Sequence, residues 1–331
     1  MSTCVSVNEW DSMSSMLTTS YSSLQKFSEC PRQWYLNDYR RLKPIVEKRT
    51  GALPFGGRIH SALEMRGNGE DLLEAWHALS AHEYALVEEA GGGNWDTTDL
   101  DRETALGLVM LSGLIEWEAE EGEDQVFEVV AVERQMKNLM TVTTPEGEPV
   151  DIWLYGKLDQ LLRHRETGNY WIMDWKTTAN LEEATNSSLF LSPQPRIYRE
   201  HVRQEHPDIP IDGVRYTVMR KVKRTASAKP PFYWNYDMRM TDYNVNEHMI
   251  RVAALTGRMQ HTVDLLDAGV PHSLAAPFNP TWRCSSCPFK NVCLVMQMDG
   301  MDAAEDMIED LYIEGDPWER YKKETEEGHE V

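Results

Sequence analysis

The order of hydrophobic and polar positions divides the chain into a helical first part and a strand-rich middle. Apolar residues recur at helical spacing and predict helices over 54–66, 70–90 and 102–120, with a break at "GGGNW" between the last two. Strand-like runs then cluster at 126–133, 139–143, 152–162, 170–176 and 214–220. Further helices are expected over 20–40, 188–205 and 243–268. This order predicts a mixed α/β core, with helices packed around a central sheet.

One predicted strand carries charge inside an apolar run. It reads "YWIMDWKTT" over 170–178, and it follows the turn "ETGN" at 166–169, which joins it to the preceding strand as an antiparallel hairpin. Because side chains alternate along a strand, Asp174 and Lys176 project from one face and Trp175 from the other. Buried charge is costly unless it is paired or holds a metal. A structural ion pair and an active site both fit this pattern.

A second carboxylate lies in the preceding strand, where "LYGKLDQLL" contains Asp159. The hairpin can bring Asp159 close to Asp174, so that two carboxylates and an ammonium group converge. Two like charges at that distance repel one another unless a cation lies between them. Oxygen ligands of this kind favour Mg²⁺ or Mn²⁺.

The cysteines follow a metal-site pattern. The chain has five, an odd number, and no apparent secretory signal, which argues against a disulfide framework. "CSSCPFKNVC" places Cys284, Cys287 and Cys293 at the spacing C-x2-C-x5-C, and Cys30 lies far upstream in "SECPRQWY". Four thiolates suit either zinc or an iron–sulfur cluster, and spacing alone does not choose between them.

The charge of the chain is strongly acidic and uneven. The net charge of −21 taken alone argues against a nucleic-acid partner, but residues 301–331 hold 12 Asp and Glu against 3 Lys and Arg. We expect this segment and the acidic run at 116–128 to be solvated surface, which leaves room for a local basic groove. "RKVKRTASAK" at 220–229 is the most basic segment; it either flanks the active site or forms a solvated loop.

Neither a membrane span nor a secretory leader is expected. No apolar run reaches roughly 18 residues, and the first ten residues lack a basic region followed by an apolar one. An intracellular, cytoplasmic protein is the resulting expectation.

Six motifs occur in an order that resembles the RecB-type exonucleases of the PD-(D/E)xK nuclease superfamily. That family includes CRISPR-associated RecB-like nucleases, iron–sulfur nuclease domains of bacterial helicase–nucleases and many phage exonucleases. The motifs are S-x-L-x-x-F-x-x-C-P, G-x-x-x-H, G-x-x-D, D-W-K-T, Q-x-x-x-Y and C-x2-C-x5-C, at 22–31, 56–60, 156–159, 174–177, 194–198 and 284–293. The resemblance covers most of the chain, from about residue 20 to 293.

The resemblance implies a restriction-endonuclease-like core with an N-terminal helical part and a C-terminal iron–sulfur region. It also implies a Mg²⁺- or Mn²⁺-dependent deoxyribonuclease, an exonuclease of DNA recombination, repair or phage replication, with a helicase or recombination protein as a possible partner. The implied metal ligands are His60, Asp159, Asp174 and the carbonyl oxygen of Trp175. Lys176 would position the attacking water, and Gln194 and Tyr198 would orient Lys176 or contact the DNA strand. The resemblance favours [4Fe–4S] over zinc at Cys30, Cys284, Cys287 and Cys293.

The expected organisation is a flexible N-terminus over 1–16, one nuclease domain over 17–300 and an acidic extension over 301–331 that is dispensable for cleavage. Two other functions remain open. A non-catalytic nucleic-acid-binding module on a nuclease scaffold would have no need of the intact Asp159, Asp174 and Lys176. An acidic interaction protein that mimics DNA would spread its carboxylates evenly, whereas the acidic runs here lie outside the motifs.

Overall fold

The computed structural model of the chain describes residues 16–91, 97–121, 123–143, 147, 149–180 and 189–321. The chain divides into two compact units. The terminal unit comprises Met1–Val46, Gln135–Gly156 and Tyr243–Val331, and the central unit comprises Glu47–Arg134 and Lys157–Asp242. The "GGGNW" break and nearly all of the expected flexible N-terminus lie outside the described residues.

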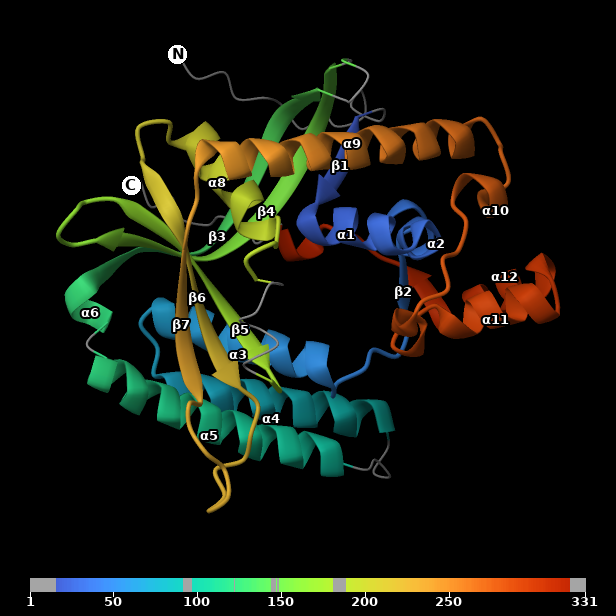
Figure 1. The fold of residues 1–331 in the computed structure, drawn as a ribbon. Coiled ribbons are helices and arrows are strands. Elements are labelled where there is room, and N and C mark those ends of the chain that lie inside the picture. The colour runs from blue at the N-terminus through green and yellow to red at the C-terminus, as the bar shows by residue number, and fades with distance from the viewer. Residues whose placement is uncertain are drawn as a thin grey trace, which may run out of the picture. The chain divides into compact units, whose positions relative to one another are not determined.

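The central unit is built on a mixed sheet (Figure 1). The end of β4 (Pro149–His164) pairs antiparallel with β5 (Tyr170–Thr178), β5 pairs parallel with β6 (Ile211–Arg220), and β6 pairs antiparallel with β7 (Tyr233–Arg239). The predicted hairpin between β4 and β5 is confirmed. Its loop is closed by the His164 amide, which donates to the Asn169 carbonyl at 2.8 Å, and Gly168 supplies the positive φ of 74° that the turn requires.

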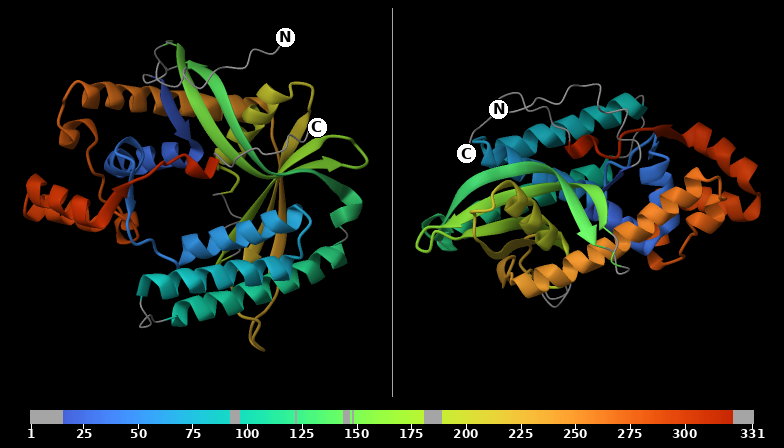
Figure 2. Two further views of the ribbon diagram at one scale, coloured as in Figure 1. Left: turned by 180° about the vertical axis from the view of Figure 1, so that it is seen from behind. Right: turned by 90° about the horizontal axis from the view of Figure 1, so that it is seen from above.

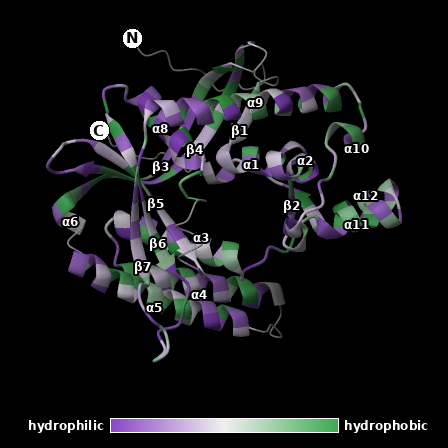
Figure 3. Ribbon diagram, in the orientation of Figure 1, coloured by the Kyte–Doolittle hydropathy of each residue, from purple (hydrophilic) through white to green (hydrophobic). Residues whose placement is uncertain are grey.

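Three helices cover one face of this sheet: α3 (Ala52–Gly67), α4 (Leu72–Gly91) and α5 (Thr98–Glu121). Figure 2 shows them side by side, and Figure 3 shows hydrophobic and hydrophilic positions interspersed along α4 and α5. Their apolar residues form one core with alternate residues of β5, namely Trp171, Met173 and Trp175. Fully burying a large apolar side chain contributes about 1.5–3 kcal/mol, so this core fixes which face of β5 points away from the helices.

Helix α8 (Gln194–Glu205) packs against β5 and β6 with Ile197 and Val202 buried. The helix predicted over 188–205 therefore begins later. Residues 189–193 form a turn, and Pro195 lies in the first helical turn, where its missing N–H breaks no helical hydrogen bond.

The terminal unit begins with β1 (Leu17–Ser20), which pairs parallel with the first half of β4. The helix predicted over 20–40 is divided into α1 (Tyr21–Glu29), α2 (Pro31–Trp34) and a π-helical turn η3 (Tyr35–Tyr39). The division falls at Cys30, which is extended at φ −156° because a residue before proline disfavours the helical region. The long helix predicted over 243–268 is α9 (Asp242–Asp267).

The C-terminal elements of the terminal unit are part of a second core. Helix α11 (Lys290–Met298) packs against α12 (Met301–Leu311), and β8 (Tyr312–Glu314) pairs antiparallel with β2 (Leu42–Pro44). The buried residues of this core are Leu36, Leu42, Phe289, Val292, Ala304, Ile308 and Tyr312. The described part of the acidic extension is therefore not solvated surface alone, since truncation after Gly300 would remove three of these core residues.

Ile308→Ala is expected to lower the free energy of unfolding by about 2–5 kcal/mol, because it deletes methyl groups from a packed core where Ile308 is 3% exposed. Urea unfolding measures the change. Leu311→Ala in the same helix is the control: Leu311 is 50% exposed, and its replacement should cost no more than about 0.5 kcal/mol. Equal losses in the two variants would contradict this packing.

The other differences between the predicted and the observed elements are local. The two runs predicted at 126–133 and 139–143 form one long strand, β3 (Phe127–Thr143), which pairs with β4, and β7 was not predicted. The remaining short elements are α6 (Glu123–Val126), α10 (His272–Ala275), η5 (Trp282–Ser285) and η6 (Glu319–Tyr321). None of the described helices combines the length and apolar character needed to cross a membrane.

Candidate active site

Strand β5 presents two charged side chains on the face opposite its aromatic residues. Trp175 lies in the core beneath the helices, whereas Asp174 and Lys176 point to the α8 side of the sheet. The Asp174 side chain is buried, and the Lys176 ammonium lies 2.5 Å from its Oδ2. The predicted pairing of these two charges is therefore present within the central unit.

Asp159 joins them from β4. The β4–β5 ladder ends with Gln160 paired to Met173, and Asp159 and Asp174 are the next residues of the two strands. Its Oδ2 accepts a hydrogen bond of 2.9 Å from the backbone amide of Trp175. The hairpin thus brings the two predicted carboxylates together.

His60 approaches Asp159 from α3, with its Nδ1 at 3.2 Å from Asp159 Oδ2. Burial lowers the pKa of His60, but the charge and hydrogen bond of Asp159 outweigh it and hold that pKa above its ordinary value. Burial likewise raises the pKa of Asp159, but the neighbouring His60 outweighs this effect, so the Asp159 pKa lies below its ordinary value. Both shifts favour the charged form of each partner.

Asp174 is shifted in the opposite direction. Burial raises its pKa, the Lys176 ammonium partly reverses that effect, and the negative charge of Asp159 raises it again, so the net pKa lies above its ordinary value. Its Oδ2 is fully buried and, within the described residues, contacts Lys176 without an aligned hydrogen bond. Neighbouring carboxylates whose pKa values move apart are typical of functional sites.

Helix α8 adds the last two predicted residues. Lys176 Nζ donates to Gln194 Oε1 at 3.2 Å, and Gln194 Nε2 donates to the Tyr198 hydroxyl at 2.9 Å. Gln194 and Tyr198 are four residues apart and share one helical face. A continuous line of contacts therefore runs from Asp174 through Lys176 to Tyr198.

The donor set suits a hard divalent cation. It consists of two neighbouring carboxylates, one of them with a buried oxygen that lacks an aligned hydrogen bond, and an imidazole beside them. Across the described parts of the chain, however, no three His, Cys, Asp or Glu side chains are already arranged to hold a metal ion. At this site the carboxylates are already paired, Asp159 with His60 and Asp174 with Lys176. A bound cation would have to replace these ion pairs.

The four motif cysteines come together in the terminal unit as free thiols. Cys30 lies between α1 and α2, Cys284 in η5, Cys287 in the turn that follows, and Cys293 in α11. The pKa of Cys293 is raised to about 11, chiefly by burial; Arg32 lowers it, and Cys287, Cys30 and Cys284 contribute to the rise. Each of the other three thiols thus lies close enough to Cys293 to influence its ionisation.

Backbone amides donate to three of these sulfurs. The Asn279 amide lies 3.4 Å from Cys30 Sγ and the Thr281 amide 3.5 Å from Cys284 Sγ. The Phe289 amide donates to Cys287 and opposes the rise that burial causes in the Cys287 pKa. Sequence reasoning missed these donors, because a backbone amide leaves no mark in residue identity.

An aromatic residue and the basic segment lie outside the carboxylate site and the group of four cysteines. Trp34 is buried and packs edge-on against Phe27, so it is a core residue. The basic segment 220–229 starts beside the end of β5, where the Lys221 amide donates to the Thr178 carbonyl at 2.7 Å.

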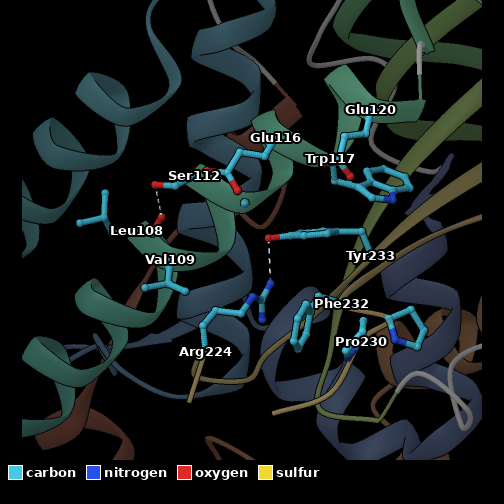
Figure 4. Close-up of a pocket in the computed structure, with 12 residues that line it drawn as sticks. Leu108, Val109, Ser112, Glu116, Trp117, Glu120, Arg224, Pro230, Phe232 and Tyr233 are labelled. Atoms are coloured by element: carbon cyan, nitrogen blue, oxygen red, sulfur yellow. Dashed lines mark hydrogen bonds between the residues drawn. The ribbon is translucent and has the colours of Figure 1, made fainter. Parts of the chain in front are cut away.

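A pocket of about 750 Å³ lies elsewhere in the central unit (Figure 4). It is lined by α5 and by residues 224 and 230–233, and it contains none of the predicted site residues. Its wall forms where Tyr233 approaches α5: the Tyr233 hydroxyl donates to the Met110 carbonyl at 2.6 Å and accepts from Arg224 at 2.8 Å. We therefore do not assign the chemistry to this pocket.

Gly113→Ala is expected to lower the midpoint of thermal unfolding, at a cost of about 1–3 kcal/mol. A Cβ at Gly113 would lie 2.5 Å from the Tyr233 hydroxyl oxygen, which is held by its two hydrogen bonds. Gly57→Ala, also inside a helix, is the control. A Cβ there meets nothing within 4 Å, so the same replacement should stabilise the chain by about 0.5–1 kcal/mol. Shifts of the same sign would contradict the close approach at Gly113.

Comparison with known proteins places this site in context. Residues 18–294 match the family model of the PD-(D/E)XK nuclease superfamily. No curated protein sequence matches the chain. One solved structure, described as the crystal structure of SSO0001, is 13% identical, with 83% of this chain and 85% of that chain covered and a TM-score of 0.36.

Proposed function

The chain belongs to the PD-(D/E)XK nuclease superfamily, and from that premise we propose that it is a metal-dependent DNA nuclease acting as an exonuclease. The observation that carries the proposal is the convergence of Asp159, Asp174 and Lys176 at the β4–β5 hairpin. We further propose that it acts inside the cell on DNA of recombination, repair or phage replication, together with a helicase or recombination protein.

Asp159, Asp174, His60 and the carbonyl oxygen of Trp175 are the residues that would hold Mg²⁺ or Mn²⁺. When bound, the metal lowers the pKa of a coordinated water and neutralises charge on the scissile phosphate. The backbone amide of Trp175, which donates to Asp159 Oδ2, fixes that carboxylate against β5. Protein-held carboxylates of this kind suit a hard cation that also binds substrate phosphate oxygens.

Lys176 would position the attacking water and stabilise the charge that develops on the phosphate. A compact ammonium group suits both tasks. Gln194 accepts from Lys176 Nζ and is itself tied to Tyr198, so α8 restricts where the ammonium can lie. Pre-positioned charge stabilises a transition state without reorganisation during the reaction.

We also propose that Cys30, Cys284, Cys287 and Cys293 bind one [4Fe–4S] cluster. The proximity of the four thiols and the amide donors to three sulfurs support it. Such a cluster would join Cys30 to Cys284, 254 positions later, and so connect both ends of the terminal unit. Zinc would satisfy the same four ligands, and iron analysis separates the two metals.

The test is cleavage of end-labelled linear DNA with Mg²⁺, with Mn²⁺ or with a chelator. An exonuclease should release short labelled products from linear DNA only when a divalent metal is present, and it should leave covalently closed circular DNA intact. Binding of DNA without cleavage under every metal condition would favour the non-catalytic module instead. Cutting of the circle would retain the nuclease and reject the exonuclease.

A further inference from the structure

Arg32 is an unusually buried cation in the terminal unit. It is 2% exposed, although it lies in the short helix α2. Its Nε donates to the Ala276 carbonyl at 3.0 Å, and its Nη1 lies 2.6 Å from Met296 Sδ. Within the described residues, no carboxylate forms an ion pair with Arg32. A buried guanidinium without a counter-charge is energetically costly, so a negative partner is expected nearby.

Two of the motif cysteines lie close in sequence to Arg32 or to the residue it contacts. Cys30 precedes Arg32 by two residues, and Cys293 lies three residues before Met296, on the same face of α11. The guanidinium that contacts Met296 therefore lies along the face that carries Cys293. After burial, Cys293 and Cys30 have the strongest influence on the pKa of Arg32, which agrees with this placement. In the sequence, Arg32 is distinguished only by following the Cys-Pro pair of the motif.

We propose that Arg32 is the buried counter-charge of the [4Fe–4S] cluster, which it helps to retain and whose reduction it favours. The inference rests on the proposed cluster. Four thiolates around a [4Fe–4S]²⁺ core carry a net charge of about −2, and reduction by one electron makes it about −3. In a weakly screened interior, a fixed positive charge stabilises the more negative state. No proton moves in this step, because arginine stays protonated throughout.

The test compares Arg32→Met with Arg32→Lys after anaerobic purification. Iron per chain and the reduction midpoint, titrated with dithionite and mediator dyes, are measured in each. Removal of the charge in Arg32→Met should shift the oxidised-to-reduced equilibrium about tenfold towards the oxidised form, a midpoint lower by about 59 mV, or should lose the iron altogether. Arg32→Lys keeps the charge and should retain both the iron and most of the potential.

Arg283→Met is the matched control. Arg283 adjoins Cys284 but is half-exposed and pairs with Glu29, so its replacement should leave the midpoint unchanged. A structural role for Arg32 would predict equal damage in the Met and Lys variants. That result, or an Arg32→Met variant with full iron and an unshifted midpoint, overturns the inference. Wild-type protein without iron instead defeats the cluster proposal itself, so the two failures are distinguishable.

Discussion

Lys176→Met is expected to reduce metal-dependent DNA cleavage by about 10²–10³-fold, and Asp174→Asn by at least as much. The ammonium is the only cation in contact with Asp174 among the described residues, and one pre-positioned donor to developing charge is worth about that factor. Asp174→Asn removes the charge of the proposed metal ligand and keeps the shape of the side chain. Cleavage rates on linear DNA, measured at saturating Mg²⁺ and Mn²⁺, test both.

Fold stability has to be measured alongside these rates. Removal of one partner of a buried ion pair leaves the other uncompensated and costs about 3–5 kcal/mol, so either single variant can unfold for reasons unrelated to catalysis. The double variant Asp174→Asn/Lys176→Met removes both charges, and it should be more stable than either single variant and equally inactive. An active double variant would remove both residues from the chemistry.

Lys157→Met is the matched control for Lys176. Both lysines belong to the central unit and pair with a carboxylate, and their side chains are 28% and 30% exposed. Lys157 pairs with Glu64 and does not contact Asp159 or Asp174 through any described ion pair. Its replacement should leave the cleavage rate within about twofold. An equal loss in both lysine variants would show that the assay reports charge or stability and not catalysis.

The arrangement of β5, the strand of the candidate site, could be predicted from the sequence because one simple rule governs it. Side chains alternate along β5, so Trp171, Met173 and Trp175 had to share the core face and leave Asp174 and Lys176 on the other. A short turn then limited the register of the hairpin enough to bring Asp159 to Asp174. The helical spacing of Gln194 and Tyr198 was equally local, and their hydrogen bond follows from it.

The C-terminal core escaped prediction because its pairing is not local. Strand β8 pairs with β2 about 270 positions earlier, and no short-range pattern indicates such a partner. Acidic residues also obscured the apolar face of α12, where Ala304 and Ile308 lie one turn apart among carboxylates. The net charge of 301–331 predicts a solvated tail. A helix with one acidic face and one apolar face, however, carries the same net charge.

The burial of Arg32 could not be predicted, for a different reason. An arginine in a helix is usually exposed, and nothing in the sequence indicates that this one is buried. Its burial follows from contacts with Ala276 and Met296, more than 240 positions away. The amides that donate to the cysteine sulfurs are likewise set by backbone geometry and not by residue type. Residue spacing thus singled out the four cysteines but not the groups that surround them.

Cys284→Ser is expected to be the most informative of the cysteine replacements. Cys284 is exposed, so as an ordinary surface thiol its replacement should change stability by no more than about 0.5 kcal/mol. As a cluster ligand, its loss should remove the iron and lower the free energy of unfolding by roughly 2–5 kcal/mol, the range for losing a native cross-link. Absorbance near ~400 nm, iron content and the urea midpoint should all fall together.

Two comparisons complete this prediction. Cys30→Ser should resemble Cys284→Ser, because the loss of either ligand opens the same link between distant segments of the terminal unit. Cys4→Ala, outside the motifs and outside the described residues, should change neither iron content nor stability. A wild-type chain that holds one zinc and no iron, or a Cys284→Ser variant as stable and as rich in iron as the wild type, would reject the cluster. Neither result would affect Asp159, Asp174 or Lys176, because those residues belong to the central unit and bind through different atoms.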